Sequence, residues 1–190
     1  AGWVFAGAAL LLGIFRGQAL ARDIHLVMLS LRGGPTALAL QQVETFVAAH
    51  PDWGLRVYRT PAGLRLLATH TTFDPRGKDV EAFFAALHVD PVFAIMCYRQ
   101  NCFRARLTPK PWRMGLGFQG WSSRRQVWPL SPGALPARTD WVARYDAARV
   151  DFAACEFLTT CGSSTICPAT LLIVRYHDEV CHADRGLPLA

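Results

Sequence analysis

Hydrophobic residues recur along the first part of the chain at two spacings, which predict alternating strands and helices. An apolar run over 23–31 is typical of a strand. Over 35–50 the apolar residues recur every three or four positions, which predicts a helix. Two short apolar stretches, 55–60 and 64–69, flank a Pro-Ala-Gly turn and predict a β-hairpin.

The next segment continues the alternation. Residues 80–87 have the spacing of a helix that faces a core, and Asp90 caps a second helical stretch. Residues 102–108 alternate strictly between apolar and polar, which predicts a half-buried strand. The order strand, helix, strand, strand, helix, strand predicts an α+β protein of ferredoxin-like βαββαβ topology. In that fold, helices cover one face of an antiparallel sheet.

The last third predicts a linker and two helices. Residues 112–136 are rich in Gly, Pro, Ser and Trp and show no sustained period. Asp140 is expected to cap a helix that carries Phe152 and Cys155, and Pro168 to begin a helix to about His182, with Ile173, His177 and Val180 on one side. The predicted parts are an apolar segment (1–21), the ferredoxin-like domain (22–111), the linker (112–137) and C-terminal helices packed on the domain (138–190).

The N-terminal segment is the most apolar part of the chain. Residues 2–15 carry no charge, Trp3 lies near one end, and Arg16 and Arg22 follow the other. A truncated membrane anchor explains this pattern best, because aromatic and basic residues flank membrane helices. A signal peptide cleaved at Ala21 and a buried core helix remain alternatives.

The position of the arginines predicts the compartment. Positive charge just after an anchor places the following domain in the cytoplasm. The sequence has six cysteines, and in a reducing compartment we expect all six thiols to be free. Secretion after cleavage at Ala21 would instead predict disulfides.

Charge is distributed unevenly along the 190 residues. The net charge is +6, and all of the excess positive charge lies before residue 139, because the rest of the chain is acidic. This asymmetry is compatible with a nucleic-acid surface at the front, or with docking of the two parts on each other.

The hairpin suggests one candidate binding surface. If Val57 pairs with Leu66, the opposite sheet face presents cations that suit phosphate and an aromatic ring that suits base stacking. The candidate anion-binding or nucleic-acid-binding residues are Arg56, Tyr58, Arg65, Arg104 and Arg106. The alternative is that C-terminal helices cover this face and neutralise its arginines with Asp140, Asp146, Asp151 and Glu156.

The cysteines and histidines match no known motif. No Cys-x-x-Cys pair, phosphate-binding loop or hydrolase motif is present in the sequence. A metal site could gather Cys161, Cys167, His177 and Cys181, but it would lack a close ligand pair. We therefore predict no catalytic residues, no metal site and no cofactor.

Three stretches carry a resemblance to a known family. RVYRTPAGLRLLATHTTFDP (56–75), CFRARLTPKPWRMG (102–115) and DRGLPLA (184–190) resemble an uncharacterised bacterial family of small membrane-anchored proteins. This resemblance implies an apolar N-terminal segment before an α+β domain, and no activity. The hairpin is also loosely similar to the palm of archaeo-eukaryotic-type primases, but Arg and His stand where that palm carries metal-binding carboxylates.

These observations predict a membrane-anchored, non-enzymatic module. Its partners would be the membrane, through the N-terminal helix, and another protein. The alternative function is binding of nucleic acid or a nucleotide phosphate on the arginine-rich sheet face.

Overall fold

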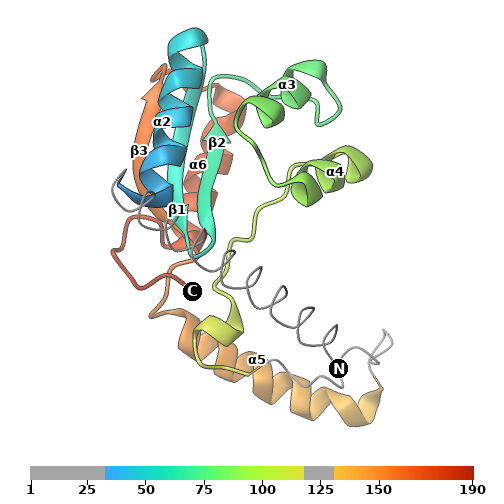
Figure 1. Ribbon diagram of the computed structural model, residues 1–190. Coiled ribbons are helices and arrows are strands. Elements are labelled where there is room, and N and C mark those ends of the chain that lie inside the picture. Colours follow the sequence, from blue (N-terminus) through green and yellow to red (C-terminus); the bar gives the residue numbers. More distant parts are fainter. Residues whose placement is uncertain (1–32, 118–130) are drawn as a thin grey trace, which may run out of the picture. The chain divides into compact units, whose positions relative to one another are not determined.

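A computed structural model of the chain describes residues 33–117 and 131–190 (Figure 1). The chain divides into two compact units, 1–42 and 43–190. Helix α2 (Gly34–Ala49) begins in the first unit and ends in the second. The first unit is described only from Gly33 onwards, and the sheet belongs to the second unit.

The second unit is an α+β structure built on a three-stranded antiparallel sheet. Strand β1 (Gly54–Thr60) lies in the middle, between β2 (Gly63–Ala68) and β3 (Glu156–Gly162). Strands β1 and β2 form the predicted hairpin in the predicted register, with Val57 opposite Leu66. The α+β class and the hairpin are therefore confirmed.

Five α-helices accompany the sheet in the described part of the chain. Helix α4 (Pro91–Gln100) begins where expected because the Asp90 side chain accepts a hydrogen bond from the amide of Val92. The predicted helices after Gly34, near residue 80, after Asp90 and after Cys167 are confirmed. In addition to α2, the helices are α3 (Lys78–Ala86), α4 (Pro91–Gln100), α5 (Leu135–Arg149) and α6 (Pro168–Cys181).

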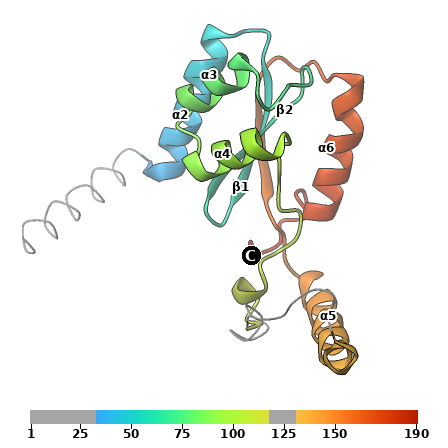
Figure 2. The same cartoon turned by 90° about the vertical axis from the view of Figure 1, so that its right-hand side faces the viewer.

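The helices of the second unit lie on both faces of the sheet (Figure 2). Helix α6 covers one face, where the His177 ring lies 4.6 Å from the Tyr58 ring. Helices α3 and α4 lie on the other side. There the ring of Trp53, just before β1, stacks on Phe83 of α3 at 4.9 Å. Both sheet faces are therefore covered.

Residues 102–108 do not form the predicted strand. Both neighbours of β1 are other segments, β2 and β3. The carbonyl of Arg106 accepts a hydrogen bond from the Arg65 side chain. Leu107 packs against the buried cluster that contains Tyr58, while Phe103 stays exposed. The alternating pattern thus belongs to an extended, unpaired segment, and the ferredoxin-like strand order is not confirmed.

The prediction for the region after the linker needs two corrections. Helix α5 begins at Leu135, with a proline in its first turn, rather than at Asp140, and it ends at Arg149. Phe152 and Cys155 therefore follow this helix instead of lying on it. The third strand, β3, comes directly after Cys155 and was not predicted.

Several predictions concern residues outside the described ranges. These are the apolar segment 1–21, the strand 23–31 and half of the predicted linker. Among the residues that the structure does describe, no helix is long and apolar enough to cross a membrane.

Candidate functional site

The inner side of α6 carries the polar residues of the candidate site. Its buried side chains are spaced as on one helical face, with His177 one turn before Cys181. Ile173, which the sequence placed on the same side as His177, is exposed on the outer side. The buried residues of α6 are Thr170, Val174, His177 and Cys181.

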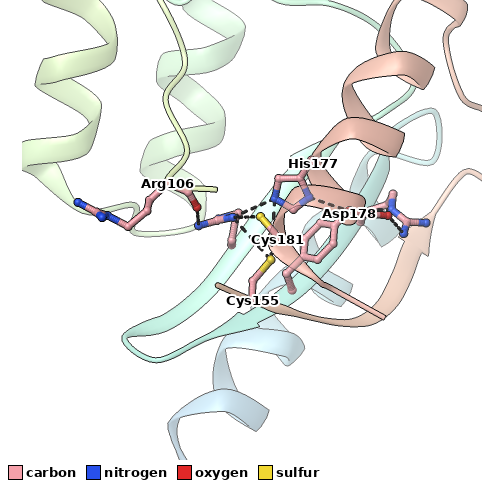
Figure 3. Close-up of polar contacts among 8 residues, drawn as sticks. Arg106, Cys155, His177, Asp178 and Cys181 are labelled. Carbon is pink, nitrogen blue, oxygen red and sulfur yellow. Dashed lines mark hydrogen bonds and ion pairs between the residues drawn. The ribbon is translucent and has the colours of Figure 1, made fainter. Parts of the chain in front are cut away.

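Cys155 reaches the same place from the segment before β3. The amide of Ala154 donates to the carbonyl of Cys181 at 3.0 Å, which holds this segment against the end of α6. The Sγ atoms of Cys155 and Cys181 and a ring nitrogen of His177 then lie within 4.8 Å of one another. All three residues are buried, and Figure 3 shows their side chains close together.

Arg65 of β2 places its guanidinium group among these three side chains. Its Nη1 lies 2.9 Å from Nε2 of His177 and 3.6 Å from the Sγ atoms of both Cys155 and Cys181. Its Nη2 donates to the carbonyl of Arg106 at 2.7 Å. Because arginine is always charged and only donates hydrogen bonds, the thiol cluster is centred on a cation.

Asp178 links this cluster to a second arginine on β1. Its carboxylate contacts His177 Nδ1 at 2.9 Å and accepts from the Tyr58 hydroxyl at 2.7 Å and from Arg56 Nη2 at 2.6 Å. Arg56 also lies 4.1 Å from the centroid of the Phe157 ring, a cation–π contact. A continuous set of polar contacts therefore runs from β1 through α6 to β2.

These contacts affect the pKa of His177 and fix which ring nitrogen donates a hydrogen bond and which accepts one. Burial lowers the pKa of His177, but hydrogen bonds with Cys181 and Asp178 raise it, and the net effect is a raised pKa. The neutral ring donates from Nδ1 to Asp178 and accepts at Nε2 from Arg65. A proton on Nε2 would face the N–H group of Arg65, so the arrangement with Arg65 requires the neutral ring.

The two thiols share one proton unequally. A hydrogen bond from the Cys155 thiol, together with His177 and Arg65, lowers the pKa of Cys181 to about 5 although burial opposes this. The same hydrogen bond and burial raise the pKa of Cys155. The pair as a whole therefore loses its first proton more easily than an ordinary thiol, and the remaining proton lies between the two sulfurs.

The cluster also offers ligand atoms that suit thiophilic metal ions. Two cysteines and one histidine bind zinc or copper(I), and a carboxylate on the other ring nitrogen is common at such sites. However, an ion held by all three residues would take the place of Arg65 Nη1. The present arrangement therefore favours a thiolate paired with arginine. Of the four metal ligands considered from sequence, only His177 and Cys181 belong to this cluster.

The five candidate residues of the sheet face divide into two groups. Arg56, Tyr58 and Arg65 come together on one face, as predicted, but α6 covers that face and Tyr58 is fully buried. Arg104 and Arg106 lie on the exposed segment after α4, where Arg104 donates to Gln100.

The acidic partner of these arginines is Asp178, which was not among the carboxylates considered from sequence. Two of those, Asp140 and Asp146, pair with arginines of their own helix α5. Glu156 pairs with Arg59, its neighbour across β1 and β3. The alternative in which an internal carboxylate neutralises the sheet arginines thus holds for Arg56, but that carboxylate is Asp178 of α6.

Cys155, His177, Asp178 and Cys181 were not recognised as one site from the sequence. One signal was available, since a histidine and a cysteine one turn apart occupy the inner side of an amphipathic helix. Such a polar pair in a core requires a polar partner. The position of Cys155 was missed because its segment was assigned to a helix.

Comparisons of the chain with protein-family models, with curated proteins and with solved structures find no match. The fold and the site define an α+β protein with a buried, arginine-centred dithiol.

Helix α4 provides a second feature, on the other side of the sheet. Its inner residues include Cys97, which is fully buried, and Phe93, whose ring lies 5.9 Å from that of Phe84. Its outer residues are also apolar and are exposed. These are Val92 (64% exposed), Ile95 (53%) and Met96.

Proposed function

We propose that this protein is a non-enzymatic interaction module that binds a partner protein through the outer stripe of α4, defined as Val92, Ile95, Met96 and Arg99. The supporting observation is that α4 is apolar on both sides although one side faces solvent. A helix that is apolar all round is normally covered by another element. The stripe has the i, i+3, i+4, i+7 spacing of helix-in-groove recognition.

Charge around the stripe indicates the chemistry of the partner. Residues 91–106 contain three arginines and no acidic residue. Arg99 belongs to the stripe, and Arg104 binds Gln100 at the end of the helix. We infer that the partner segment is an amphipathic helix with an apolar face and acidic flanks, because such a helix complements both features.

We expect the Ile95→Asp substitution to weaken binding of an acidic amphipathic peptide at least about tenfold, because a carboxylate would be desolvated next to acidic flanks. The probe is a synthetic helix with leucines on one face and glutamates beside them, and its binding to the full chain is followed by fluorescence anisotropy. The control is Leu172→Asp, since Leu172 is 73% exposed on α6. This variant should bind like the original protein.

Two results would overturn this proposal. One is equal weakening by Ile95→Asp and Leu172→Asp, which would show that binding is not specific to α4. The other is failure to bind the acidic peptide together with Ile95-dependent binding to vesicles containing anionic lipid. The stripe would then be a lipid contact.

We also propose that residues 2–15 anchor the protein in a membrane, with the domain on the cytoplasmic side. This rests on the uncharged run between Trp3 and Arg16. Membrane fractionation of cells that produce the full chain should recover it with the membranes, and deletion of residues 2–15 should release it. Recovery of the intact chain entirely in the soluble fraction would refute the anchor.

A further inference from the structure

The thiol cluster has features that neither interaction nor anchoring requires. Two free cysteines, one before β3 and one at the end of α6, meet in the core beside a charged guanidinium group. Figure 3 shows Cys155 and Cys181 facing each other, with His177 above them. A packed core needs neither a cation nor a thiolate at this place, because apolar residues of similar size would fill it at lower cost.

We propose that Cys155 and Cys181 form a peroxide-reactive dithiol, in which Cys181 is the attacking sulfur and Cys155 the resolving sulfur. The oxidant is hydrogen peroxide, which is small enough to reach a buried sulfur. This property is independent of the proposed docking stripe on α4.

The chemistry takes place in two balanced steps. The Cys181 thiolate attacks one oxygen of hydrogen peroxide, the O–O bond breaks, and hydroxide leaves, which makes Cys181 a sulfenic acid. The Cys155 sulfur then attacks Cys181, the S–O bond breaks, and a disulfide forms. The thiol proton of Cys155 leaves with the departing hydroxide as water. Peroxide gains two electrons, and the two thiols lose them.

The contacts place positive charge and a ring nitrogen beside both sulfurs. Arg65 Nη1 lies 3.6 Å from each Sγ, and Nε2 of His177, one helical turn before Cys181, lies 3.9 Å from the Sγ of Cys155. These groups, with the hydrogen bond from Cys155, favour the charged form of Cys181. The raised pKa of Cys155 favours its protonated form, which leaves the first attack to Cys181.

Three other cysteines lack this environment. Burial raises the pKa of both Cys97 and Cys161, so these thiols stay protonated. Cys102 is exposed and lies in the segment after α4. The cluster itself lies one side chain below the surface, because Arg65 joins it to the exposed residue Arg106.

The test exposes the reduced full chain to one equivalent of hydrogen peroxide and maps the products by peptide mass spectrometry. We expect a disulfide between Cys155 and Cys181 that a dithiol reductant reverses. In Cys155→Ser, dimedone should trap a sulfenic acid on Cys181, and in Cys181→Ser, Cys155 should stay reduced. The mapping of the unsubstituted protein tests the pairing even if a variant fails to fold.

The role of the cation gives a second readout. Arg65→Met should slow disulfide formation at neutral pH, because it removes the cation that contacts both sulfurs, and Arg65→Lys should restore part of the rate. In the unsubstituted protein the rate should fall only as the pH drops through about 5. Cys102→Ser is the matched control and should leave the rate unchanged.

The proposal is wrong if Cys102 is oxidised while Cys155 and Cys181 both stay reduced in the folded protein. It is also wrong if the disulfide joins another pair, or if Arg65→Met forms the disulfide as fast as the original protein.

Discussion

Asp178→Ala is expected to lower the free energy of unfolding by about 4 kcal/mol, the typical cost of removing one partner of a buried ion pair. The side chains of Arg56 and Asp178 are only 18% and 13% exposed. Without the carboxylate, Arg56 keeps a buried charge, and the Tyr58 hydroxyl and His177 Nδ1 each lose a partner. Chemical denaturation of the purified variant measures the loss.

Two further variants separate charge from shape. Asp178→Asn keeps the size of the side chain and one acceptor oxygen, so it should lose less than Asp178→Ala. Asp140→Ala removes a pair with Arg144 whose aspartate is 69% exposed, and it should change stability by no more than about 0.5 kcal/mol. A loss below about 1 kcal/mol in Asp178→Ala would show that the contacts around Asp178 do not hold α6 on the sheet.

Gly162→Ala, at the end of β3, should lower the free energy of unfolding by about 3 kcal/mol, from backbone strain and overpacking together. Gly162 has a φ of +78°, which L-residues with a side chain rarely adopt. An added Cβ would lie 2.1 Å from the carbonyl oxygen of Trp53 and 3.2 Å from the side chain of Val47. The Trp53 carbonyl cannot withdraw freely, because it accepts a hydrogen bond from Ser163.

Gly186→Ala is the matched control for this substitution. Gly186 has a φ of +63°, but no atom lies within 4 Å of the place of its Cβ. Its loss should therefore be about 1 kcal/mol, the cost of the left-handed conformation alone. Equal losses in thermal or chemical denaturation of the two variants would mean that the chain relieves the close contact at Gly162 without cost.

Local signals were sufficient for part of the fold. The hairpin register followed from a two-residue alternation on both sides of a short turn, and the structure pairs Val57 with Leu66 as expected. The start of α4 followed from Asp90, whose capping bond depends only on residues next to it. Such features are encoded within a few residues.

Pairing between strands that are far apart in the sequence could not be predicted from such local signals. Residues 102–108 alternate as well as a strand does, yet β3 takes the place beside β1. The β3 sequence EFLTTCG has no clean alternation, and a residue is skipped in its pairing with β1 between Phe157 and Thr159. A choice between two candidate neighbours depends on packing against α6, which periodicity does not describe.

The candidate site was only partly predictable for a related reason. Side-chain direction along β1 and β2 placed Arg56, Tyr58 and Arg65 on one face correctly. Whether that face binds an external anion or an internal carboxylate depends on where α6 lies. The meeting of Cys155 with Cys181 depends in turn on backbone bonds between the segment before β3 and the end of α6.

The distance along the chain between the partners of this site determines the order in which they can meet during synthesis. Arg56 and Asp178 are 122 residues apart in the sequence, whereas β1 and β2 are joined by a tight turn. The hairpin can therefore form early, while closing the long loop to α6 is slow and entropically costly. Until α6 leaves the ribosome, the nascent hairpin presents Arg56, Tyr58 and Arg65 to water. The surface that ends as the core of the protein is thus, for part of its life, a positively charged outer surface.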